Sequence, residues 1–234
     1  MKKIIFGIII ILIVLLLIGG YLGFVPILSD ILDKPKDLGI KYSQEDLNSI
    51  FEKAPYVIET VPEGTLANGE KQYEGNQVIK TTFSSEEVSA CISLSSWSAN
   101  PFKDVQVKFN EDGTAEASGK IIFDNAINYA NRIGYSTSKV TDAMDKYKIP
   151  KSNISFYISG TFEIKDNTPK INVQTLKVGK ITVPKNIFND DMANTVTSTY
   201  LNKIPNYKAN NISIENSQLV YDVATPKKVI REGN

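Results

Sequence analysis

The side chains that most enzymes use for proton transfer are missing from this chain. None of its 234 residues is histidine, which excludes the usual general base near neutral pH, the Ser-His and Cys-His nucleophile pairs and the commonest zinc ligand. Cys91 is the only cysteine, so no disulfide can form within the chain. It falls on the apolar side of an expected short helix, a position typical of a buried, unreactive thiol.

Paired acidic residues could suggest the two carboxylates of a glycosidase. Glu86-Glu87 and Asp190-Asp191, however, each occupy the first turn of an expected helix, where capping and the helix dipole already account for them. The oxygen-rich loop at residues 110–113 lacks the spaced carboxylates of a calcium loop and lies where a hairpin needs its turn. We therefore assign no catalytic, cofactor-binding or metal-ligating residue.

Two further kinds of enzyme site leave no motif in the sequence. No glycine-rich loop joins a strand to a helix, and no G-x-S-x-G nucleophile elbow occurs. A Ser-Lys dyad has no recognisable spacing, and serines are plentiful at residues 89–98, so an enzyme of that type stays open as a third hypothesis. The interpretation that we favour is that the protein is not an enzyme and needs no cofactor.

The elements that must position any site are short strands and helices. Alternating apolar residues predict three antiparallel hairpins, which join 105–109 to 115–123, 156–164 to 171–178, and 212–214 to 219–223. The expected helices begin at Ser43, at Ser84 with Glu87 completing a capping box, at Asp124, at Ser138 and near residue 190, the last ending at Ile204.

Before these elements comes an apolar run, residues 4–28, that contains no charged side chain and follows Lys2 and Lys3. Roughly 20 apolar residues suffice for a helix to cross a bilayer, and the two lysines favour a cytoplasmic N-terminus. A cleaved signal peptide is the alternative, but cleavage after the glycines near the end of the run would lack the second small residue that processing requires.

The sequence is therefore divided into an N-terminal transmembrane anchor (1–28), a polar tether (29–39), an extracytoplasmic domain (40–225) and a polar tail (226–234). The fold class is α+β: an N-terminal transmembrane helix followed by antiparallel β-hairpins packed with several short helices. Basic and acidic residues number 26 each, and without Lys2 and Lys3 the exported part has a slight acidic excess, which argues against a nucleic-acid partner.

Aromatic residues crowd the centre of the sequence and leave two interpretations open. They could pack an ordinary core, or they could line an apolar groove between sheet and helices that admits a lipid chain. The residues concerned are Phe83, Trp97, Phe102, Phe109, Phe123, Tyr129, Phe156, Tyr157 and Phe162.

Four segments carry a resemblance to a known family: FSSEEVSACIS, VQVKFNEDGTAEASGKI, FYISGTFEIKDNTPKINVQTLKVGKITVP and YLNKIPNYKANNISIENSQLVY. In pattern the chain resembles uncharacterised bacterial membrane-anchored extracytoplasmic domains, and it is similar to the single-module relatives of the tubular lipid-binding (TULIP-like) superfamily. That resemblance implies one module, a binding role and no catalysis.

These observations lead to two main expectations. The first is a non-enzymatic domain, tethered to the bacterial cell membrane on its outer side, that binds an apolar ligand such as a lipid. The alternative is a structural or protein-interaction module of the cell envelope. The sequence leaves open the identity of the ligand or partner, the oligomeric state and cleavage of the anchor.

Overall fold

A computed structural model describes residues 34–62, 64–66, 72–94, 100–132, 153–186, 188–202 and 204–232. The expected anchor at residues 1–28 and the helix expected after Ser138 lie outside these ranges. None of the helices in the described ranges has both the length and the apolar character needed to cross a membrane.

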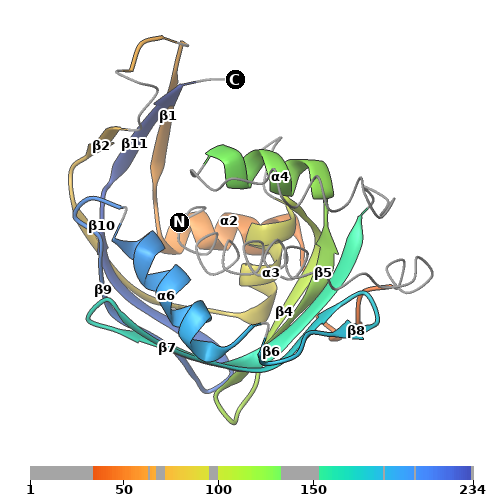
Figure 1. Ribbon diagram of the computed structural model, residues 1–234. Helices are drawn as coiled ribbons and strands as arrows, with labels where there is room; N and C mark the ends of the chain where they lie inside the picture. Colours follow the sequence, from red (N-terminus) through yellow and green to blue (C-terminus); the bar gives the residue numbers. More distant parts are fainter. Residues whose placement is uncertain are drawn as a thin grey trace.

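One eight-stranded, strongly curled sheet forms most of the molecule, and the helices lie in its concavity (Figure 1). The strand order is β3-β10-β9-β6-β5-β4, with β7 paired to β6 and β8 paired to β7. The bounds are β3 Gln77–Phe83, β4 Phe102–Phe109, β5 Thr114–Ile121, β6 Ile154–Lys165, β7 Thr168–Val178, β8 Ile181–Thr182, β9 Lys208–Glu215 and β10 Gln218–Thr225. The three expected hairpins, β4–β5, β6–β7 and β9–β10, are confirmed.

Strand β6 is the point where the sheet divides. Its first eight residues pair with β5, whereas only Ile164 and Lys165 near its end pair with β9. Its other side pairs with β7 through a tight turn at Asp166 and Asn167, both with positive φ as a two-residue hairpin turn requires. The long β6 therefore joins the two halves of the curl.

A second sheet continues the first beyond a bend, in the order β1-β11-β2. Its strands are β1 Val57–Val61, β2 Gln72–Glu74 and β11 Lys228–Glu232. β1 and β11 run parallel, the one departure from the expected antiparallel pairing. A polar tail was expected from residue 226, but here β11 is the central strand of the sheet, with Val229 fully buried. Its single apolar pair among charged residues gives too little alternation to indicate a strand.

Four helices occur in the described ranges: α2 Gln44–Lys53, α3 Ser85–Ser93, α4 Phe123–Arg132 and α6 Asp190–Leu201. The predicted caps at Ser43 and Ser84 are confirmed, each within a complete capping box. α4 begins one residue before Asp124, so that carboxylate lies in the first turn and not at the cap. α6 ends at Leu201, short of the expected Ile204, because Ile204 N–H bonds to the Leu201 carbonyl in a tighter turn.

The main core lies between the concave face of the sheet and helices α2 and α3. Its largest fully buried side chains include Phe83, Phe156 and Tyr221. A smaller cluster of Val173, Leu176, Phe188 and Ala193 packs beneath α6. The two clusters meet at the centre of the concave face, where Ile158 contacts both.

Candidate apolar ligand site

A cavity of about 130 Å³ lies on the concave face of β4–β7, with α3 on one side and α6 on the other. Val88 and Ile92 of α3 and Ala193 of α6 form parts of the two walls. The side chains of the sheet that face it are Phe102, Val105, Val107, Phe109, Ala115, Ala117, Phe156, Ile158, Phe162, Ile164, Ile171, Val173 and Leu219. All of these are apolar, and the polar residues Glu116, Ser159, Thr161 and Asn172 also line the cavity. Its wall is therefore mostly apolar and suits hydrocarbon.

Small residues on one face of β5 explain why space remains there. Ala115, Ala117 and Gly119 follow one another on the concave face, where larger residues would fill the interior. At Gly119 a Cβ would lie 2.6 Å from Val105 Cγ2, so the glycine permits close packing, while the two alanines leave room. Sequence reasoning missed this signal, although the alternation A-x-A-x-G is visible in TAEASGKI.

The aromatic residues divide between the cavity and other places. Phe102, Phe109, Phe156 and Phe162 line it, and the rings of Phe102 and Phe156 meet edge-on with centroids 5.8 Å apart. Phe83 and Phe123 pack in the main core and do not line the cavity, and Tyr157 projects from the opposite face of β6. Trp97 and the Tyr129 side chain lie outside the described part of the chain.

The α3 wall is fixed to the edge of β4 by three serines four residues apart. Backbone N–H groups of Phe109, Val107 and Val105 donate to the hydroxyls of Ser85, Ser89 and Ser93 at 3.0, 2.8 and 2.9 Å. Four helical residues rise about 6 Å and two strand residues about 6.7 Å, so the two repeats nearly match. The serines therefore accept hydrogen bonds from backbone N–H groups of β4 that no neighbouring strand accepts. Their spacing alone did not reveal this role.

Glu87 holds the same helix from its other side. Its carboxylate accepts the Ser84 N–H at 2.8 Å, as the capping box predicts, and forms an ion pair with Lys53 of α2 at 2.6 Å. Burial raises the pKa of Glu87, but the bonds from Lys53, Ser49 and Ser84 outweigh it, and the pKa lies below its usual value. The thiol of Cys91 is buried on this helix, as its position on the apolar side predicted.

The α6 wall is fixed to the outer edge of β7 by two side chains one helical turn apart. Asp190 accepts the Val173 N–H at 2.9 Å, and Asn194 accepts the Ile171 N–H at 2.8 Å. Lys185 lies 3.1 Å from the Asp190 carboxylate. The Val173 bond, with the lysine beside it, lowers the pKa of Asp190. The pair Asp190-Asp191 is in the first turn as predicted, and Asp190 also docks the helix.

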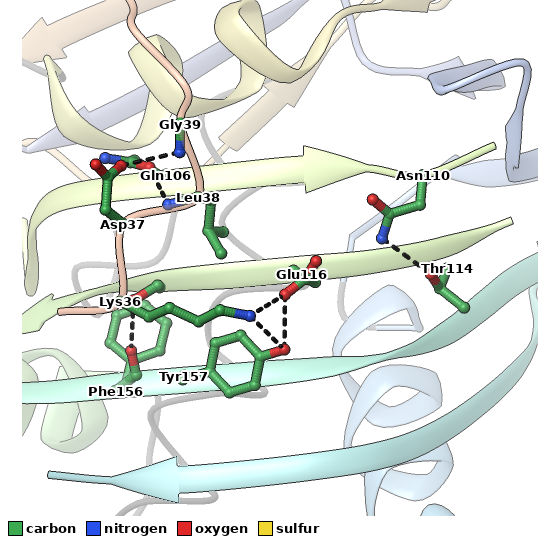
Figure 2. A network of polar contacts seen from close by, with 11 residues as sticks. Lys36, Asp37, Leu38, Gly39, Gln106, Asn110, Thr114, Glu116, Phe156 and Tyr157 are labelled. Atoms are coloured by element: carbon green, nitrogen blue, oxygen red, sulfur yellow. Dashed lines mark hydrogen bonds and ion pairs between the residues drawn. The ribbon is translucent and has the colours of Figure 1, made fainter. Parts of the chain in front are cut away.

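On the opposite, convex face of the sheet, residues 34–40 form a strap across β4 and β5 (Figure 2). Leu38 N–H donates to Gln106 Oε1 at 2.7 Å, and Lys36 Nζ lies 2.6 Å from the Glu116 carboxylate. Tyr157 O–H donates to the same carboxylate at 2.7 Å. The bond from Lys36 chiefly lowers the pKa of Glu116, and the same bond raises the pKa of Lys36. The Glu116 carboxylate is therefore bonded to the strap, although the residue also contributes to the lining of the cavity.

The acidic groups that the sequence singled out have structural partners or positions in the described ranges. Within the described ranges no three histidine, cysteine or acidic side chains gather as a metal site would require. In the 110–113 loop Asp112 accepts from both the N–H and the hydroxyl of Thr114, which is what a hairpin turn needs. Glu86 and Glu87 stand at a helix start, and neither lines the cavity.

No protein-family model, curated protein or solved structure matches this chain. The resemblance to TULIP-like proteins therefore stays a prediction based on pattern, and the geometry of the cavity carries the functional argument.

Proposed function

We propose that this protein is a non-enzymatic domain, tethered outside a bacterial cell membrane, that binds an apolar ligand such as one hydrocarbon chain of a lipid. The observation that carries the proposal is the apolar cavity between α3 and α6. The apolar run at residues 4–28 supports the tether. The missing histidine supports a binding role over catalysis.

The size of the cavity limits what enters. A cavity of roughly 150 Å³ lined by aliphatic and aromatic side chains binds benzene, and this one measures about 130 Å³. It therefore holds a group of about that size, such as the end of a single alkyl chain. The Glu116 carboxylate is bonded to Lys36 and Tyr157 on the convex face and is not available to a ligand. The polar end of an amphiphile would therefore stay at the mouth of the cavity, in water.

The expected affinity is modest, and a tether would offset this. Each buried methylene group contributes about 0.8 kcal/mol, so a chain end of four carbons gives roughly 3 kcal/mol before ordering costs. A domain held at a membrane surface meets amphiphiles at a high effective concentration, which compensates for weak binding. Membrane attachment and a small apolar cavity are therefore compatible parts of one function.

The experiment uses the full chain in phosphatidylcholine nanodiscs and a fatty acid with a diazirine at its chain end. Irradiation should attach the probe to the half-buried residues Ile158, Phe162 or Ile171, located by mass spectrometry of the peptides. Ala117→Trp fills the cavity and should lower this crosslinking more than tenfold, because displacing two or three methylene groups removes about 2 kcal/mol.

Lys170→Trp is the matched control, because Lys170 of β7 is exposed and does not line the cavity, although it precedes the lining residue Ile171. It should leave crosslinking unchanged. Benzene gives a second readout: it should raise the melting temperature of the wild-type chain and of Lys170→Trp, but not that of Ala117→Trp. Crosslinks spread evenly over the surface, with no benzene effect, would refute the cavity as a binding site.

A protein-interaction module is the second candidate, and exposed apolar residues on the strands favour it. Val57 of β1 and Val78 of β3 are 51% and 69% exposed, and β1 is an edge strand. An exposed edge with apolar side chains suits the addition of a partner strand. Crosslinking in intact cells should then join peptides at residues 57–61 to another envelope protein, and Val57→Lys should abolish that product.

A further inference from the structure

We propose that the convex face of β4–β7 rests on anionic lipid headgroups and so orients the domain on its membrane. This inference goes beyond ligand binding and depends only on the proposed membrane anchor. It starts from the strap, because the strap determines which face of the domain the chain leaves toward the anchor.

The strap places the convex face close to the bilayer. Residues 29–33 separate the apolar run from Lys34, and five extended residues reach at most about 17 Å. The chain is then held on the convex face by the Lys36–Glu116 ion pair and the Leu38–Gln106 hydrogen bond (Figure 2). Those contacts lie on the face opposite the apolar side chains of Val105 and Val107.

The charge of this face complements an anionic surface. Lys103, Lys108 and Lys177 are exposed there, and no carboxylate of the described residues lies within ion-pair distance of them, although Lys108 is opposite Glu116 in the ladder. Lys36 and Lys120 share the face, and three of its acidic groups are already engaged. These are Glu116 with Lys36, Asp104 with Lys120, and Asp37 with the Gly39 N–H.

The pairing of two strands adds a further indication. Lys103 of β4 lies directly opposite Lys120 of β5, an arrangement of like charges that destabilises a sheet. Asp104 neutralises Lys120 at 2.9 Å and leaves Lys103 uncompensated. Phosphate headgroups would supply the missing charge, and each lysine near an anionic leaflet gains about 1 kcal/mol.

This orientation also bears on the cavity. With the convex face on the headgroups, the concave face is turned away from the bilayer. A hydrocarbon chain would then reach the cavity from the aqueous side, and not by lateral movement out of the membrane.

The test measures how fast each lysine is acylated in the full chain, reconstituted in vesicles of phosphatidylcholine alone or mixed equally with phosphatidylglycerol. Labelling of Lys103, Lys108 and Lys177 should be at least about threefold slower in the anionic vesicles. Lys80 and Lys208, on other parts of the sheet, should react equally in both. The difference should vanish in about 1 M salt, where charges are screened beyond 3 Å.

A triple variant provides the second measurement. Lys120 lies on the same face, so its labelling should also be slower in the anionic vesicles. Lys103→Gln, Lys108→Gln and Lys177→Gln together should remove this protection of Lys120, whereas Lys80→Gln with Lys208→Gln should keep it. Equal labelling of the wild-type chain in both vesicles would overturn the docking proposal and leave the anchor intact. A chain that fails to enter either vesicle would overturn the anchor and the docking together, while fatty-acid crosslinking reports separately on the cavity.

Discussion

The two walls of the cavity are attached to the sheet in different ways. α3 lies along the edge of β4 with three buried or half-buried serine contacts, and seven of its nine residues are buried. α6 is attached to β7 at Asp190 and Asn194, both half-exposed, and its buried residues include Ala193, Thr197 and Leu201. The contacts of α3 with the sheet are neutral serine hydroxyls away from water, whereas those of α6 with the sheet are one carboxylate and one amide beside water.

This difference indicates which wall yields first. Contacts at a solvent-exposed helix, with few buried neighbours, open at a lower free energy than those inside a core. Opening of the first turns of α6 from β7, at Asp190 and Asn194, would widen the cavity while Leu201 at the end of the helix stays in the main core. We therefore expect faster amide hydrogen exchange in β7 than in β4, and a ligand of the proposed site would enter on the α6 side.

The largest expected effect comes from adding a side chain at Gly160, where β6 lies very close to β7, the strand that binds α6. Gly160 of β6 lies where a Cβ would be only 2.1 Å from the Asn172 carbonyl oxygen, so Gly160→Ala forces β7 to shift. Overpacking of this kind costs about 3 kcal/mol, which corresponds to a melting temperature roughly 6–12 °C lower. Thermal unfolding followed by circular dichroism measures the change, and Thr161→Ala on the same strand should melt within about 1–2 °C of wild type.

Breaking the α3 wall should have the next largest effect. Ser89→Ala leaves the buried Val107 N–H without its acceptor and should cost about 2 kcal/mol of unfolding free energy. Denaturant titration measures this loss, and Ser213→Ala, which removes a half-exposed hydroxyl elsewhere, serves as the control. If Ser89→Ala were as stable as the control, the serine contacts would not fix the wall.

The hairpins could be predicted from sequence because alternation with a period of two follows directly from strand geometry. The contacts of the α3 serines could not be predicted. In the sequence, a serine whose hydroxyl accepts from a strand edge cannot be distinguished from a serine that faces water. β11 was missed for a related reason: its two buried residues gain a partner only through a parallel pairing with the distant β1. The cavity depends on the small side chains of Ala115 and Ala117, and an alternation of apolar and polar residues does not distinguish small apolar residues from large ones.

Weakening the α6 wall should change stability less and local opening more. Asn194→Ala removes the acceptor of the Ile171 N–H at a half-exposed site and should cost about 1 kcal/mol or less. Hydrogen exchange at Ile171 and Val173 should accelerate several-fold, while exchange at Val107 stays unchanged. Equal acceleration on both strands would show that the two walls open together and would end the distinction between them.

Acid should act on the α6 wall through one group. The pKa of Asp190 is lower in the folded protein, so its stabilising contribution is present above the unfolded pKa of about 3.9 and disappears as the pH falls through the folded value. Because the group is partly exposed, the effect is a few tenths of a kcal/mol. Exchange at Val173, corrected for intrinsic rates, should rise at low pH in the wild type and show no such dependence in Asp190→Asn.

The parallel pairing of β1 with β11 has a consequence for biogenesis. Val57 and Lys228 meet in this ladder, so β1 must wait for a strand that is synthesised 171 residues later (228 − 57). Contacts of such long separation close slowly. The polypeptide therefore cannot complete this small sheet until β11 has left the ribosome, and β1 stays without its parallel partner until then.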